Sequence, residues 1–275
     1  MQTNLLAVIR RCVLAAAVLS LVPQAAPAAE IVRVGGTGMG LALARAAGDR
    51  VEALHPGTRT EVLPSLGTPG GIRALVAGAI DVAIATRAPT PDEQAKGVQS
   101  AFCLKTALVF ATSHANPAGI RLAQLPQIFS DADPRWPDGT PLKVILRSRA
   151  GTENPYLVKL MPAMEAAFDA AYKRPGMPIS ATDQENAEIA RRTAGSFAIM
   201  TLLQLRSENL ALKPLTLDGI APNAQTVAEG SYPMPLPVCL LVSPSPAPAT
   251  ARFIAFIRSP EGLDLVRSYG ANPSD

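Results

Sequence analysis

The sequence is poor in the residues that build metal centres and catalytic bases. Its 275 residues include only 2 histidines, His55 and His114, and 3 cysteines. The chain therefore has few residues from which a zinc site of His and Cys ligands, or a Ser-His-Asp triad, could be built. There is no G-x-S-x-G motif for a hydrolase nucleophile. We expect no catalytic residue, no metal and no cofactor; a secreted hydrolase is the enzyme alternative.

Aromatic and charged residues are also scarce. Aromatics make up 4% and charged residues 17% of the chain, and the net charge is only +3. Nucleic-acid binding needs clustered cations or stacking aromatics, so nucleic acid is not expected as a partner. Hydrophobic residues reach 48%, which excludes a disordered chain. The length suits one large domain or two lobes.

The N-terminus has the pattern of an export signal. Two consecutive arginines precede an apolar run at residues 12–22, and a small-residue A-x-A site ends at Ala28. This run is too short to span a bilayer as a helix. We predict a secretory signal peptide at residues 1–28, cleaved after Ala28 or, alternatively, Ala29, and a periplasmic mature protein. A buried N-terminal helix is the other interpretation.

Two cysteines, Cys103 and Cys239, remain in the predicted mature chain. An oxidising compartment favours disulfides, but the sequence does not say how far apart the two thiols lie. Each cysteine sits in an apolar run, where a buried free thiol is an ordinary core residue. The sequence leaves the pairing open.

Short apolar segments alternate with helical patterns along the rest of the chain. The predicted strands are residues 31–34, 59–63, 80–86, 102–112, 142–147 and 238–242, and the predicted helices are residues 43–54, 72–77, 122–129, a long stretch from 152 to 172, 250–257 and 261–269. This order predicts an α/β fold with a mostly parallel sheet and helices on its faces.

Three predicted strands end in small-residue turns that open helices, at residues 36–40, 68–71 and 150–152. Such turns present free backbone N–H groups beside the positive end of a helix, which suits an anion. The first turn matches neither the dinucleotide-binding fingerprint nor a P-loop. The alternative interpretation is three ordinary tight turns.

Side chains near these turns could complete an anion site. Thr68 and Thr152 offer hydroxyl donors, and Arg147 and Arg149 follow a predicted strand directly. An arginine fork suits a tetrahedral oxyanion, and Arg87 is a third candidate. Taken singly, each arginine is also compatible with a solvated surface charge.

Six segments, in order, resemble the periplasmic phosphate-binding proteins of phosphate ABC transporters, within the type II periplasmic solute-binding superfamily. The likeness covers nearly all of the predicted mature chain. The segments are GGTGMG, TPGGIRALVAGAIDVAIATRAPTPDE, LPQIFSDADPRWPDGTPLKVILRSRAGT, TAGSFAIM, EGSYPMPLPVCLLV and FIAFIRSPEGLDLVRSYG. Each motif alone is only moderately specific for this family, but six motifs in the same order are strong evidence of the resemblance.

The resemblance implies two α/β lobes joined by two crossover strands, with a ligand cleft between them. One lobe would comprise residues 29–110 and 238–275, and the other residues 111–237. It also implies a monomer that captures an inorganic oxyanion, phosphate first, and passes it to an ABC permease. The implied ligand-binding residues are Gly38, Met39, Gly40, Thr68, Arg87, Arg147, Arg149, Gly151 and Thr152.

Two departures from the family pattern widen the choice of ligand. Ala150 stands where the family has a ligand serine, and Arg87 stands where some members have the aspartate that accepts the phosphate proton. Sulfate, molybdate, tungstate or a small phosphonate therefore remain alternatives to phosphate. A sensor or scaffold that kept the fold without transport is the alternative from another class.

Overall fold

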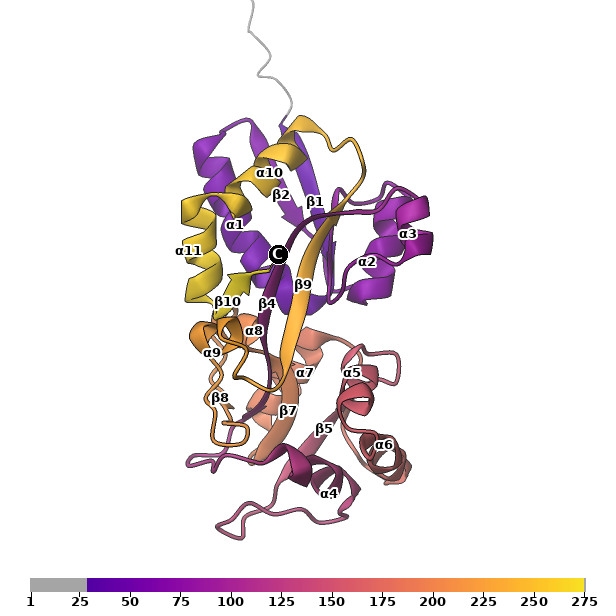
Figure 1. The fold of residues 1–275 in the computed structure, drawn as a ribbon, viewed down its shortest axis with the longest axis vertical. Coiled ribbons are helices and arrows are strands. Elements are labelled where there is room, and N and C mark those ends of the chain that lie inside the picture. The colour runs from indigo at the N-terminus through magenta and orange to yellow at the C-terminus, as the bar shows by residue number, and fades with distance from the viewer. Residues whose placement is uncertain (1–28, 275) are drawn as a thin grey trace, which may run out of the picture.

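The computed structural model describes residues 29–274 as two α/β lobes joined by two long strands (Figure 1). The first lobe contains β1 (Glu30–Gly36), a 3-10 turn (Gly38–Gly40), α1 (Leu41–Leu54), β2 (Thr58–Val62), α2 (Gly67–Val76), β3 (Val82–Ala85), α3 (Pro91–Ala95), α10 (Pro248–Arg258), α11 (Pro260–Ser268) and β10 (Ala271–Pro273). The second contains a 3-10 turn (Leu122–Gln124), α4 (Leu125–Ser130), β5 (Lys143–Arg147), α5 (Glu153–Leu160), α6 (Met164–Lys173), β6 (Ile179–Ser180), α7 (Asp183–Arg192), β7 (Ser196–Thr201) and β8 (Lys213–Pro214). The short helices α8 (Leu202–Ser207) and α9 (Ala224–Ala228) lie where the lobes meet.

The connecting strands are β4 (Gln99–Thr112) and β9 (Pro235–Val242). The strand order is β2-β1-β3-β9-β4-β7-β5-β6. Within each lobe the central pairs β1/β2, β1/β3, β5/β6 and β5/β7 are parallel, and the connecting strands join them by antiparallel pairs. This is the two-lobed type II architecture that the resemblance implies. The predicted lobe boundaries at residues 110 and 238 stay predictions.

Cys103 and Cys239 form a disulfide between the two connecting strands. They face each other directly in the antiparallel register of β4 and β9. The alternative of two free core thiols is therefore wrong for this structure, because strand pairing brings together two residues 136 positions apart. Closing so long a loop stabilises the folded chain by about 5 kcal/mol in the chain-entropy model.

Apolar periodicity explains how the first lobe packs. Leu43, Ala47 and Val51 lie on one face of α1 and are buried against the sheet, as their spacing predicts. The helix ends at Leu54, followed by the C-cap residue His55 and then Pro56. A separate core fills the second lobe, where the rings of Phe110 and Phe197 stack with centroids 4.5 Å apart.

The six predicted strands are present, with ends that differ by up to three residues. Two predicted helices are wrong in extent: α2 begins at Gly67 and not at residue 72, so the predicted turn at 68–71 is helical, and the stretch from 152 to 172 divides into α5 and α6. Pro162 lies in the gap, and a proline has no N–H to continue a helix and biases the preceding residue towards extended backbone.

Within the described residues, no helix has both the length and the apolar character needed to cross a membrane. The predicted signal peptide, residues 1–28, lies outside the described residues.

Candidate functional site

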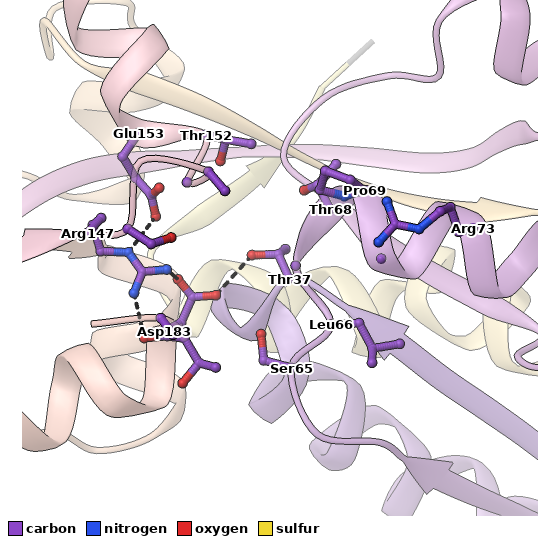
Figure 2. A pocket seen from close by; sticks show the side chains of 17 residues that line it. Thr37, Ser65, Leu66, Thr68, Pro69, Arg73, Arg147, Thr152, Glu153 and Asp183 are labelled. Carbon is purple, nitrogen blue, oxygen red and sulfur yellow. Dashed lines mark hydrogen bonds and ion pairs between the residues drawn. The ribbon is translucent and has the colours of Figure 1, made fainter. Parts of the chain in front are cut away.

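A cavity of about 350 Å³ lies between the lobes, and both lobes contribute to its walls (Figure 2). The first-lobe wall consists of Thr37, residues 65–70 and Arg73, and the second-lobe wall consists of residues 147–148, 150–153 and 181–183. Most of these residues follow the carboxyl ends of β1, β5 and β6. In α/β proteins, ligands bind at this edge of a parallel sheet.

Backbone geometry shapes the first-lobe wall. A Cβ on Gly71 of α2 would come within 2.5 Å of the Gly36 Cα, so glycine permits the helix to press against β1. Gly36 has a φ of +120°, and a Cβ there would meet the backbone of Ile84 at 2.1 Å. The pair of glycines therefore allows the start of α2 to lie directly beside the end of β1.

The N-terminus of α2 faces the cavity. Its N-cap residue, Leu66, supplies no side-chain cap, so the first-turn N–H groups are not satisfied by a capping side chain. The Thr68 hydroxyl accepts a hydrogen bond from the Thr86 backbone N–H at 3.0 Å and lies 3.1 Å from the Thr86 hydroxyl. These groups form a polar, partly positive surface that suits an anion.

Arg147 dominates the second-lobe wall, and its side chain is only 6% exposed. Its Nε donates to Glu153 Oε1 at 3.1 Å, and its Nη2 donates to Asp183 Oδ1 at 2.8 Å. Its Nη1 donates to the Ser180 hydroxyl at 3.2 Å and to the Thr182 carbonyl. Four of the donor bonds of this guanidinium are therefore made within the protein.

The two carboxylates beside Arg147 are as buried as the guanidinium, with side chains 3% exposed at Glu153 and 5% at Asp183. Burial, and then the negative charge of Asp183, raise the pKa of the Glu153 carboxyl, against the opposing attraction of Arg147. Two carboxylates thus flank one guanidinium. When all three are ionised, the cluster carries a net negative charge.

Three hydrogen bonds cross the cleft and hold the lobes together. The Thr37 hydroxyl donates to Asp183 Oδ2 at 3.1 Å, and the Thr86 hydroxyl donates to the Thr152 hydroxyl at 3.1 Å. The Gln184 side-chain amide donates to the Gly38 carbonyl at 3.0 Å. The structure is therefore a closed arrangement in which Asp183 contacts both Arg147 and the opposite lobe.

Four of the nine predicted ligand-binding residues line the cavity. They are Thr68, Arg147, Gly151 and Thr152. The structure brings these residues together from two segments that are distant in the sequence, one at Thr68 and one at residues 147–152. Whether they contact a ligand remains a prediction.

The other predicted residues lie outside the cavity lining. Met39 is buried in the core, and the space beside Gly38 is taken by Asp183 and Gln184. Gly40 packs against Ile84.

Two predicted arginines also point to other partners. Arg87 donates to both carboxylate oxygens of Glu93, at 2.7 and 2.8 Å. Arg149 pairs with Asp169 at 3.1 Å and lies over the ring of Tyr172, with its side chain 61% exposed. A ligand contact at either arginine also remains a prediction.

Sequence reasoning did not single out Thr37, Arg73, Glu153 or Asp183. Thr37 lies inside the first predicted glycine-rich turn, although it was not named as a binding residue, and Glu153 directly follows the third. Arg73 lies one turn into the helix that the second glycine-rich turn opens. Asp183 had no such signal: it lies 36 residues from Arg147 in a polar stretch.

Among residues 29–274, no group of three or more His, Cys, Asp or Glu side chains is placed to hold a metal ion. His55 is the C-cap residue of α1. His114 lies in the loop after β4, where its ring stacks on Trp136 and its Nε2 is 3.0 Å from Asp138.

Solved structures similar to this chain include transport proteins and a regulator domain. A putative phosphate ABC transporter substrate-binding protein with bound phosphate from Clostridium perfringens is 16% identical, with a TM-score of 0.73 over 90% of this chain and 100% of that one. An ABC-type phosphate transport receptor from Vibrio cholerae is 17% identical, with a TM-score of 0.59 over 88% and 99%. The regulatory domain of MetR, a LysR-family regulator from N. meningitidis, is 10% identical, with a TM-score of 0.52 over 89% and 100%.

At these identities the structural matches show the fold alone. No curated protein matches the chain. A family model described as a PBP superfamily domain matches residues 22–261, which is most of the chain. Together with the two-lobed fold, this match shows that the chain belongs to the PBP superfamily.

Proposed function

We propose that this protein is an exported solute-binding protein that captures a phosphate-type oxyanion between its lobes and delivers it to an ABC permease. The observation that carries the proposal is the interlobe cavity, which is lined by the N-terminus of α2 and Thr68 from the first lobe and by Thr152 from the second. Backbone N–H groups and hydroxyls can replace the hydration shell of an anion without a metal.

The comparisons support the class of ligand. The Clostridium perfringens protein is described with bound phosphate, and the Vibrio cholerae protein is described as a phosphate transport receptor. Export rests on the predicted signal peptide. Capture by lobe closure fits the hydrogen bonds that already cross the cleft, because closure of two lobes around a ligand is a common hinge transition.

We propose the Thr68 hydroxyl as the main side-chain contact of the oxyanion. Arg147 has one N–H that is not used by its protein partners, and a contact between that N–H and the ligand remains a prediction. For Gly38, Met39, Gly40, Arg87 and Arg149, the positions outside the cavity lining do not support direct contact.

The test is a thermal-shift series on the mature protein, freed of co-purified ligand, with phosphate, sulfate, molybdate, tungstate and methylphosphonate at matched ionic strength. A ligand that binds only the folded state raises its stability by about 2.7 kcal/mol at a hundredfold excess over Kd. We expect a shift with at least one phosphate-type oxyanion and its loss in Thr68→Ala. Thr140→Ala, an exposed threonine far from the cavity, is the matched control and should keep the shift. No shift with any of these anions would contradict the proposal.

A second candidate function is a sensor or scaffold domain. It is favoured by the position of the Asp183 carboxylate, which accepts hydrogen bonds from Arg147 in its own lobe and from Thr37 in the other. A bound anion would make the same link between the lobes. The protein's own carboxylate can therefore hold the lobes closed without a ligand. Such a domain would show no stabilisation by anions, and its radius of gyration in solution scattering would not change when anions are added.

A further inference from the structure

The second-lobe wall of the cavity has the wrong charge for a simple anion clamp. Arg147 is flanked by the carboxylates of Glu153 and Asp183, and the side chains of all three are no more than 6% exposed. One positive charge faces two negative ones when all three are ionised. In a buried site with little water to screen it, this excess would repel a bare oxyanion placed next to it.

One of these carboxylates is incompletely satisfied. Glu153 Oε1 accepts from Arg147, but Oε2 is buried and has no hydrogen-bond partner within the described residues. An unpartnered buried acceptor costs about 1–3 kcal/mol, so such groups call for an explanation. Glu153 lines the cavity, and a ligand group that donates hydrogen bonds would supply the missing partner.

The first-lobe wall has the opposite character. The N-terminus of α2, without a side-chain cap, lies beside the Thr68 hydroxyl, and Arg73 from the same helix also lines the cavity. Figure 2 shows Thr68 and Arg73 on one side of the view and Arg147, Glu153 and Asp183 on the other. The cavity therefore has a positive wall and a negative wall.

The size of the cavity also exceeds the needs of an inorganic ion. Small organic ligands occupy pockets of about 300–1,000 Å³, and this one measures about 350 Å³. A four-oxygen anion held at the α2 end would leave room between itself and the carboxylates. A ligand that spans both walls would fill that room.

We propose that the ligand is a small organic zwitterion, with its oxyanion at the N-terminus of α2 and an ammonium group against Glu153 and Asp183. This inference rests on the proposed function, and it specifies that the phosphate-type ligand also carries an ammonium group. An ammonium supplies three N–H donors and a positive charge. It would pair with Glu153 Oε2 and offset the excess negative charge of the cluster.

The experiment compares two phosphonates that differ only in the ammonium. Titration calorimetry on the mature protein would measure binding of 2-aminoethylphosphonate, ethylphosphonate and inorganic phosphate at the same pH and ionic strength. We expect 2-aminoethylphosphonate to bind at least tenfold more tightly than ethylphosphonate.

A substitution then assigns the preference to the carboxylates. Glu153→Gln keeps an oxygen that can accept from Arg147 but removes the charge. We expect it to weaken 2-aminoethylphosphonate binding at least tenfold and to strengthen ethylphosphonate binding, because an anion loses a repulsive neighbour. If Glu153 had only a structural role, the substitution would weaken the binding of both phosphonates. Glu165→Gln, on the exposed side of α6, is the matched control and should change neither.

Two other outcomes are distinguishable. If ethylphosphonate or phosphate binds as tightly as 2-aminoethylphosphonate, the inference is wrong and the proposed function stands. If none of the phosphate-type ligands binds, both the inference and the proposed function are wrong.

Discussion

The two walls of the cavity are built in different ways. The first-lobe wall is a backbone structure: Gly36 and Gly71 permit the close approach of α2 to β1, and the helix start provides the polar surface. The second-lobe wall is a side-chain structure, in which Arg147 holds two carboxylates from α5 and α7. A surface of backbone N–H groups can accept many different anions, whereas a buried cluster of charged side chains favours ligands of complementary charge. On the proposed function, we expect the first wall to supply most of the affinity for an oxyanion and the second wall to supply the selectivity between ligands.

Of the substitutions that test this difference between the walls, the removal of the Arg147 side chain should cause the largest loss of stability. Arg147→Ala leaves two carboxylates buried without their cation, and we expect a loss of about 3–5 kcal/mol of unfolding free energy. Arg149→Ala, two residues along the same loop, removes an exposed ion pair and should cost no more than about 1 kcal/mol. Chemical denaturation at pH 7 measures both, and equal losses would show that the cluster is not a buried network.

Thr37→Val breaks the hydrogen bond that joins the walls. The Thr37 hydroxyl donates to the buried Asp183 carboxylate, and hydrogen bonds to charged groups contribute about 1.5–3 kcal/mol. We expect a loss of this size, together with a larger radius of gyration in solution scattering as the cleft opens. Thr140→Val removes a similar Thr–Asp bond at the surface and should change neither quantity appreciably.

Gly71→Ala tests the first wall. Its Cβ would lie 2.5 Å from the Gly36 Cα, so α2 must move away from β1, at a cost of about 1–3 kcal/mol. Gly57→Ala has open space around its Cβ and serves as the control. Oxyanion binding should weaken in Gly71→Ala alone, because the start of α2 is displaced. Unchanged stability and binding would show that the close approach is not needed.

The smallest effect is expected at Arg87, whose ion pair lies outside the cavity. The hydrogen bonds from the Arg87 side chain, with smaller contributions from Thr90, lower the pKa of Glu93 from 4.5 to about 2. A lowered carboxyl pKa stabilises the fold above pH 4.5, and this contribution disappears as the pH falls from about 4.5 to about 2. Arg87→Ala should therefore cost up to about 1 kcal/mol at pH 7 and almost nothing at pH 2. A difference that persists at pH 2 would contradict this linkage.

Local patterns predicted much of the fold. Apolar runs and helical periodicity placed six strands, and the order of motifs identified the superfamily and the two-lobed architecture. The glycine-rich turns led to Thr68, Arg147, Gly151 and Thr152, which do line the cavity. These features depend on neighbouring residues, because strand and helix periods and the conformational freedom of glycine are local properties.

The predictions were weakest where a contact depends on strand register. In the parallel pair of β5 and β6, Arg147 lies opposite Ser180, and this register brings residues 182 and 183 beside the guanidinium. Nothing local to Arg147 indicates that Asp183 will be its partner. The same reasoning explains Cys103 and Cys239, whose pairing follows from the register of β4 and β9.

The sequence by itself determined the strands, the helices and the glycine-rich turns, because periodicity and turn residues act over a few positions, and the resemblance of its motifs implied the superfamily and the two lobes. Only the tertiary structure decided which arginine is buried, which carboxylates surround it and that the connecting strands share a disulfide. Those contacts join residues that are distant in the chain, and their energies depend on burial, which exists only after the lobes have packed.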